Sequence, residues 1–162
     1  MLYTIYPCLY EDINSGIAWI PSGIIKERAI IIIKNEIKNE SIYVDALSVD
    51  DNFINKWNEY SVEEYIENNK ILYRKKIKRK KVTNYDQYVY LNDWYRKKLH
   101  VKKYEKIELK IEICNSLIGD IFALLQHPQA VVRISSKLGL LGVILGLLGI
   151  VPLIKEIYLI WK

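Results

Sequence analysis

The stretch LGLLGVILGLLGIVPLI, residues 138–154, has no charged side chain in seventeen consecutive positions. A Lys-Glu pair follows, after which IYLIW restores the apolar character, so that residues 138–158 supply 21 positions. Crossing roughly 30 Å of hydrocarbon takes about 20 helical residues. Tyr158 and Trp161 carry the amphipathic rings that settle at a bilayer interface. The sequence therefore predicts a transmembrane helix over residues 138–160.

The alternative for this segment is a helix buried in the core of a soluble protein. That alternative explains the composition poorly, because the segment holds four glycines. Each of them would weaken a helix in water by about 1 kcal/mol. We therefore favour the membrane.

Small residues recur on one face of the segment, at steps of four, three, four and three: Ser135, Gly139, Gly142, Gly146 and Gly149. In lipid, close backbone approach at small residues is a main source of helix association. The stripe predicts a homo-oligomer held by the span, and a pore would be a further step. The alternative is that small residues are simply common in membrane helices.

The N-terminal residues MLYTIYP lack the positive and apolar regions of a signal peptide. The positive-inside rule decides little, because two Lys/Arg precede the span and two follow it. Export of some 130 residues without a signal is improbable. We expect a single-pass protein of the cell membrane with its soluble domain in the cytoplasm.

Residues 1–113 favour strands over helices. The strand signals are short β-branched or alternating runs, at 28–34, 41–49, 70–79, 86–91 and 104–113. Two short helices are expected, at 53–60 and 93–99, each preceded by a capping Asp or Asn. The predicted fold class is α+β: a small β-rich domain, barrel- or sandwich-like, followed by the transmembrane helix. Its last strand–helix–strand unit is similar to one half of a double-psi-like barrel.

Residues 114–137 form the predicted helical connector. NSLIGDIFALLQ reads as a short apolar helix that ends before His127-Pro128, and the residues after it lead into the span. The apolar stretch has two possible places: the bilayer interface, as an elbow, or the surface of the domain.

Charge is distributed very unevenly along the chain, although the net charge is only +5. Residues 1–69 carry 5 Lys/Arg against 12 Asp/Glu, whereas residues 70–110 carry 15 against 4. The cations of this basic region form two clusters. The first comprises Arg74, Lys75, Lys76, Lys78, Arg79, Lys80 and Lys81, and the second Arg96, Lys97, Lys98, Lys102 and Lys103. Such clusters predict a polyanion as ligand.

Anionic membrane lipids are the expected ligand of both clusters, because each Lys/Arg near an anionic surface contributes about 1 kcal/mol and the tether keeps lipid close. Direct nucleic-acid binding is the rival interpretation, since counterion release rewards the same cations. Tyr73, Tyr85, Trp94 and Tyr95 are then available to stack on bases. The remaining alternative is a solvated cationic surface without a ligand.

Motifs for catalysis are missing from the sequence. It has no GxGxxG, no Walker A loop and no GxSxG, and its two histidines and two cysteines lack metal-site spacing. We therefore predict no catalytic residues, no metal and no cofactor, and a protein that is not an enzyme.

The cationic clusters and the span together resemble the membrane effectors that accompany short prokaryotic Argonautes in antiviral defence. The likeness rests on Arg74–Lys81, Arg96–Lys103 and the glycine-rich run up to Gly149. It covers most of the chain at the level of architecture. The resemblance implies a toxic effector of abortive infection that an Argonaute complex recruits, that binds anionic phospholipids through a basic pocket, and that depolarises the membrane. The competing hypothesis is a passive tail-anchored adaptor that holds a nucleic acid or an acidic protein at the membrane.

Overall fold

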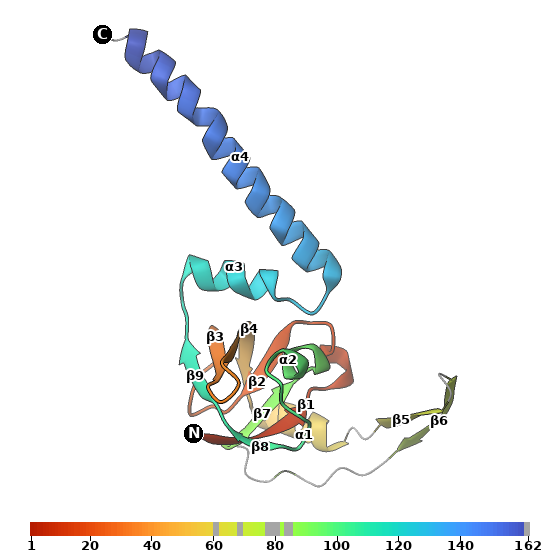
Figure 1. Ribbon diagram of the computed structural model, residues 1–162. Helices are drawn as coiled ribbons and strands as arrows, with labels where there is room; N and C mark the ends of the chain where they lie inside the picture. Colours follow the sequence, from red (N-terminus) through yellow and green to blue (C-terminus); the bar gives the residue numbers. More distant parts are fainter. Residues whose placement is uncertain (60–61, 68–69, 77–81, 83–85, 161–162) are drawn as a thin grey trace.

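The protein consists of a curled β-rich domain from which one long helix projects (Figure 1). The computed structural model describes residues 1–59, 62–67, 70–76, 82 and 86–160. Strands and helices of this domain, followed by an apolar C-terminal helix, confirm the predicted α+β class and its barrel-like, β-rich form.

A seven-stranded mixed sheet has the order β8-β1-β7-β2-β4-β3-β9. Pairs β1–β7 and β2–β4 are parallel, and the other pairs are antiparallel. In chain order the strands are β1 (Leu2–Pro7), β2 (Ile17–Ile20), β3 (Arg28–Asn35), β4 (Glu40–Ser48), β7 (Tyr88–Leu91), β8 (Lys106–Glu108) and β9 (Lys110–Ile113).

The two edges of the curled sheet meet at Leu109. The single strand predicted over 104–113 is in fact two, β8 and β9, which pair with opposite edges of the sheet: β8 with β1 and β9 with β3. One residue spans at most about 3.5 Å, so the two edges must meet where Leu109 joins them. Leu109 is buried at this junction, and its N–H donates to the carbonyl of Met1 at 3.0 Å.

The main core lies inside this curl and is built from β-branched side chains. On β3 and β4 the buried positions alternate, with Ile31, Ile33, Ile42 and Val44 fully buried. Branched side chains suit such a pleated, close-packed surface.

Two short helices cover the sheet. They are α1 (Asp51–Glu59) and α2 (Asp93–Lys98), and a 3-10 turn, η1 (Tyr10–Asp12), precedes β2. Both predicted caps are confirmed: Asp50 accepts from the N–H of Phe53 at 2.7 Å, and Asn92 accepts from the N–H of Tyr95 at 2.9 Å. Helix α1 adds a smaller aromatic core in which Phe53 stacks on Trp19 with ring centroids 4.2 Å apart.

A separate two-stranded sheet is formed by β5 (Val62–Glu67) and β6 (Lys70–Lys76). Its antiparallel register places Glu64 opposite Arg74 and Glu63 opposite Lys75. The two strands together carry four cations and three carboxylates, so the net charge of the hairpin is far smaller than that of the run Arg74–Lys81.

Helix α3 (Leu117–Leu125) lies across the sheet, and helix α4 (Ala130–Ile160) rises from it (Figure 1). Phe122 of α3 stacks on Tyr43 of β4, with ring centroids 5.0 Å apart. The predicted apolar helix of the connector is thus confirmed, and it packs on the domain.

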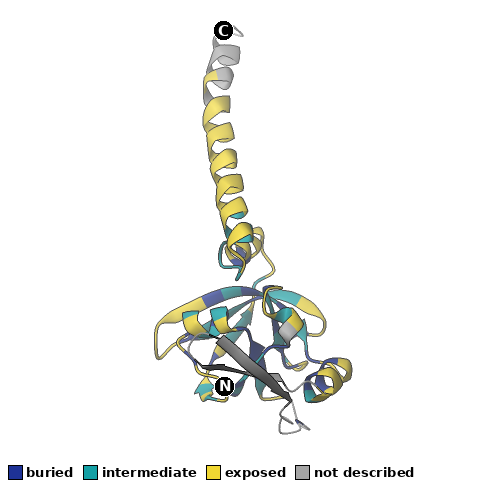
Figure 2. Ribbon diagram, turned by 90° about the vertical axis from the view of Figure 1, so that its right-hand side faces the viewer, coloured by how far each residue is buried: buried dark blue, intermediate teal, exposed yellow. Residues whose placement is uncertain are grey.

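From Leu138 to Ile150, helix α4 is exposed along its whole length (Figure 2). By length and composition it holds a candidate membrane span at Ala130–Ile150, none of which is buried in the structure. An apolar helix exposed in this way fits a single-pass membrane protein, because water is a poor solvent for such a surface.

Candidate functional site

The joint between the domain and α4 is held by a compact set of hydrogen bonds. Gln126, which ends α3, accepts at its backbone carbonyl from the Trp94 Nε1–H at 3.1 Å. Its side-chain Oε1 accepts from the N–H of Tyr43 at 3.0 Å. One strand and one helix of the domain thereby fix the point where α4 begins.

Arg133, in the first turns of α4, tightens this joint. Its Nη1 donates to the carbonyls of His127 at 2.6 Å and Pro128 at 2.7 Å. Its guanidinium carbon lies 4.2 Å from the centroid of the Trp94 ring, a cation–π arrangement. Arg133 therefore ties the foot of α4 to α2.

Lys98 of α2 approaches the same tryptophan, with its Nζ 5.7 Å from the ring centroid of Trp94. Burial lowers the pKa of Lys98, and the nearby charges of Arg133 and Lys137 lower it further, while Glu40 opposes them. Like charges near a half-buried ammonium disfavour its protonated form. Burial is the larger cause of the lowered pKa, and the two neighbouring cations add to it.

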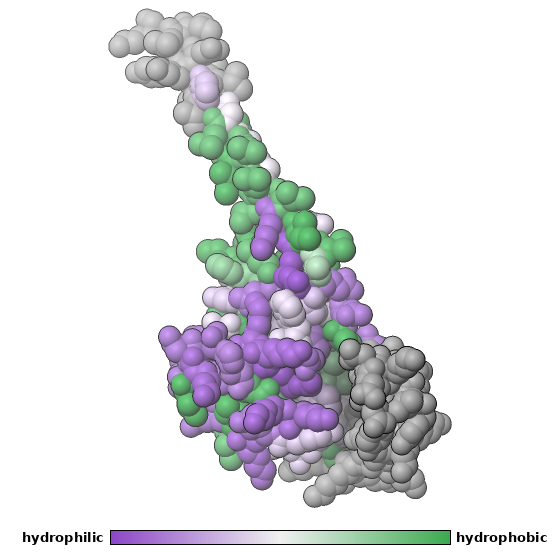
Figure 3. Space-filling view, turned by 45° about the vertical axis from the view of Figure 1, so that its right-hand side comes forward, coloured by the Kyte–Doolittle hydropathy of each residue, from purple (hydrophilic) through white to green (hydrophobic). Residues whose placement is uncertain are grey.

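We call Lys98, Arg133 and Lys137 the juxtamembrane cluster. Within the described part of the chain, none of the three makes an ion pair with a carboxylate. Arg133 and Lys137 are one turn apart on α4, immediately before the uncharged run that starts at Leu138. Figure 3 shows hydrophilic surface reaching the foot of the hydrophobic helix.

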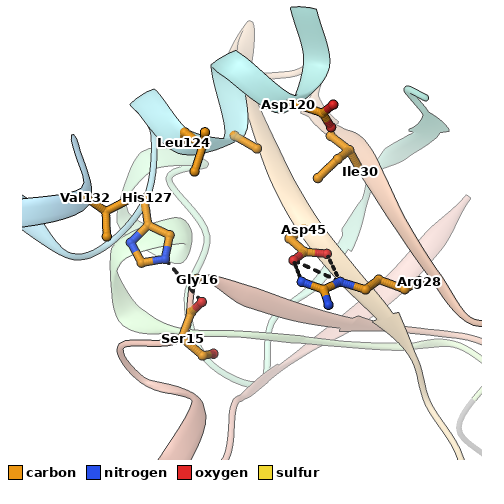
Figure 4. Close-up of a pocket in the computed structure, with 10 residues that line it drawn as sticks. Ser15, Gly16, Arg28, Ile30, Asp45, Asp120, Leu124, His127 and Val132 are labelled. Carbon is orange, nitrogen blue, oxygen red and sulfur yellow. Dashed lines mark hydrogen bonds and ion pairs between the residues drawn. The ribbon is translucent and has the colours of Figure 1, made fainter. Parts of the chain in front are cut away.

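A cavity of about 480 Å³ lies beneath α3, next to the joint (Figure 4). Arg28 and Asp45 form an ion pair on one wall, with 3.0 Å between Nε and Oδ1, and Asp120 adds a second carboxylate. His127 lines the other side, its Nε2 lying 3.2 Å from the carbonyl of Ser15. Two carboxylates against one paired guanidinium give the cavity no surplus of positive charge, so it is a poor site for an anion.

The first predicted cluster is only partly described. Arg74, Lys75 and Lys76 lie on β6, whereas Lys78, Arg79, Lys80 and Lys81 fall outside the described residues.

Members of the second predicted cluster lie in different surroundings. Arg96 is largely buried and donates to the carbonyl of Leu91 at 2.8 Å, and Lys97 pairs with Asp93 at 2.6 Å, so both have partners within the domain. Lys102 and Lys103 are exposed on the segment between α2 and β8.

Among the predicted cations that lie in the described residues, the structure brings only Lys98 to the foot of α4. Its two companions, Arg133 and Lys137, were not predicted as ligand-binding residues. Sequence offered one signal for them, the position of two cations directly before an uncharged run.

The small residues predicted to mediate self-association all lie on α4, and the four glycines expose an open face. A Cβ added at any of Gly139, Gly142, Gly146 and Gly149 would meet nothing within 4 Å. Ser135, which begins the stripe, is exposed as well. The single chain leaves this face uncovered.

Among the described residues, no group of three His, Cys, Asp or Glu side chains is placed to hold a metal ion. The chemistry available at the joint is therefore that of cations and an indole ring.

Comparison with known proteins adds little. No family model matches the chain, and no curated protein matches it significantly. Among solved structures it is similar to a rationally designed protein, mkDPBB_sym2, at 13% identity and a TM-score of 0.38, over 68% of this chain and 95% of that one. So remote a likeness carries no argument, and the resemblance to a double-psi-like barrel stays a prediction.

Proposed function

We propose that this protein is a single-pass membrane effector that binds anionic phospholipids beside its apolar helix and depolarises the membrane. The observation that carries the proposal is the juxtamembrane cluster: Lys98 of α2 and Arg133 of α4 share the Trp94 ring, and Lys137 follows on α4 just before the uncharged run that starts at Leu138. An anionic head group between them would relieve their mutual repulsion.

Energetics favour lipid as the ligand of this cluster. Each cation near an anionic surface contributes about 1 kcal/mol, and the span keeps lipid at high effective concentration. Trp94, which contacts both Lys98 and Arg133, has the amphipathic ring that prefers the membrane interface.

Depolarisation requires more than one copy of the chain, because a single helix encloses no pore. The open glycine face of α4 is the surface we propose for this homo-oligomer. Toxicity, a role in antiviral defence and activation by a short Argonaute complex rest on the resemblance described above. The cytoplasmic location of the domain belongs to the same proposal.

The test is depolarisation of vesicles by the full-length protein. Vesicles with a potassium gradient, made from neutral or anionic phospholipid, would report their membrane potential through a potential-sensitive dye. We expect faster loss of potential in anionic vesicles, and a slower loss for the double variant Lys98→Gln/Lys137→Gln. Lys102→Gln/Lys103→Gln changes the net charge equally and should resemble the wild type.

A membrane potential that survives at every protein density in both lipids would refute the effector and leave a passive tether. Binding of nucleic acid under those conditions would support the adaptor instead.

A further inference from the structure

Helix α3 carries an apolar surface that the domain leaves uncovered. Its inner side packs on the sheet, where Gly119 and Ala123 are buried and Phe122 stacks on Tyr43. At its N-terminal end Leu117 is 76% exposed and Ile118 is 65% exposed. Two large aliphatic side chains so exposed are unusual on a surface that faces only water.

The charged residue of α3 does not interrupt this surface. Asp120 turns toward the cavity beneath the helix, on the side of Ile30 and the Arg28–Asp45 pair (Figure 4). No lysine or arginine occurs in Leu117–Leu125. Asp120 is exposed, so it borders the apolar surface of Leu117 and Ile118 on the side of the cavity.

This surface continues into α4. Helix α3 lies at the foot of α4, at the end of the domain from which α4 projects, in both views (Figures 1 and 2). Val131 and Ile134, in the first turns of α4, are exposed in the same way at 74% and 58%. The juxtamembrane cluster occupies this end of the domain too, because Trp94 contacts both Arg133 and the carbonyl of Gln126.

We propose that α3 lies in the membrane interface, with Leu117 and Ile118 inserted at the boundary between head groups and acyl chains of the leaflet that α4 enters. The occupant of the uncovered surface is thus the lipid itself. A helix lying flat with its apolar side down is a common mode of interfacial binding. The inference rests on the membrane attachment contained in the proposed function, although it needs neither anionic lipid nor depolarisation.

Insertion of α3 would set the orientation of the domain. A single helix leaves a domain free to swivel and tilt at the surface, whereas a second contact beside it removes that freedom. The rigid joint through Gln126 and Arg133 would transmit this restraint to α2. The juxtamembrane cluster would then be held at head-group depth.

Spin labels on the full-length protein test the proposal in vesicles of neutral phosphatidylcholine. Labels at Leu117→Cys and Ile118→Cys, in a background with Cys8→Ala and Cys114→Ser, report collision with oxygen, which enriches in lipid, and with a water-soluble nickel chelate. Leu145→Cys, exposed in the middle of the span, is the hydrocarbon control. Leu2→Cys, exposed beside the N-terminus on the side away from α4, is the aqueous control (Figure 1).

We expect the labels on α3 to gain oxygen accessibility and lose nickel accessibility relative to the label at Leu2. High nickel accessibility on α3, with the label at Leu145 in hydrocarbon, would overturn this inference and leave the proposed function standing. Low accessibility to both reagents would mean that protein covers the surface, as in a dimer, and would overturn it too. A label at Leu145 that reads as aqueous would remove the membrane attachment and with it the proposed function.

The native chain provides a second measurement, free of cysteine substitutions. With both proteins in neutral vesicles, amide hydrogen exchange at the first turn of α3 should be slower in the wild type than in the variant Leu117→Asp/Ile118→Asp. Exchange rates in the sheet should be the same in both proteins. Equal exchange rates in the two proteins would contradict insertion.

Discussion

Removing two charges of the juxtamembrane cluster should abolish most of the preference for anionic lipid. The variant Lys98→Gln/Lys137→Gln keeps Arg133, whose hydrogen bonds to the carbonyls of His127 and Pro128 hold the joint. The structural consequence is therefore confined to two ammonium groups. Any loss of selectivity can be assigned to charge.

The magnitude follows from the position of the two cations. Each contributes about 1 kcal/mol near an anionic surface, so the pair accounts for about 2 kcal/mol. Since about 1.4 kcal/mol corresponds to a factor of ten, the association constant for anionic relative to neutral lipid should fall by up to about 30-fold. The variant also loses the repulsion between Lys98 and Arg133. That repulsion is present whether or not an anionic lipid is bound, so its loss does not offset the loss of lipid binding.

Electron spin resonance of spin-labelled lipids measures this quantity directly. The motionally restricted fraction of labelled phosphatidylglycerol, compared with that of labelled phosphatidylcholine, gives the relative association constant at the protein boundary. Screening shortens the reach of exposed charges from about 8 Å at 0.15 M salt to about 3 Å at 1 M. We therefore expect the difference between wild type and variant to shrink at high salt.

The control Lys102→Gln/Lys103→Gln removes the same charge from an exposed segment that does not touch the joint. An equal loss of selectivity in both variants would mean that only net charge matters. Unchanged selectivity in Lys98→Gln/Lys137→Gln would refute the reasoning from the structure.

Three further predictions concern the domain itself. Gly16→Ala should lower the free energy of unfolding by about 2 kcal/mol in denaturant titrations, because Gly16 has a φ of 73° and a Cβ there would collide with the His127 ring. The control Gly23→Ala should be nearly neutral, because a Cβ at Gly23 would meet nothing within 4 Å. Asn35→Ala should cost about 1–3 kcal/mol by the same assay, since the fully buried Asn35 amide donates to a backbone carbonyl at 2.8 Å. The pKa of Lys98 lies below its ordinary value, so between its folded and its unfolded pKa the unfolded chain binds more protons than the folded one. The free energy of unfolding should therefore rise as the pH rises through this interval. NMR of labelled lysines should show the pKa of Lys98 move back up when anionic lipid is added.

The periodicity of apolar residues along the sequence predicted most of the fold. The alternation of β3 and β4 and the caps at Asp50 and Asn92 were predicted from sequence, because they depend on neighbouring residues. The break at Leu109 was not predicted, since it does not disturb the alternation of apolar and charged residues. Only pairing with two distant strands, β1 and β3, reveals it.

The candidate site was harder to predict, because it is assembled across the chain. Lys98 and Arg133 are 35 positions apart and meet only because α3 turns the chain back over the sheet and Trp94 lies between them. Runs of like charge drew attention to Arg74–Lys81 instead. There the strand register sets Glu63 and Glu64 opposite two of the cations, a pairing that counting charges along the sequence cannot reveal.

The joint also bears on where the bilayer begins. Helix α4 has 31 residues and is therefore about 46 Å long, which exceeds the roughly 30 Å of hydrocarbon by several turns. A span over Ala130–Ile150 would place Arg133 inside the membrane, yet its guanidinium is already bound to two carbonyls and to the Trp94 ring of the domain. A charge held by the domain cannot leave it to follow the helix into lipid, so the hydrocarbon has to start beyond Lys137. We therefore expect the span to occupy residues 138–158, with α3 and the first two turns of α4 at head-group depth.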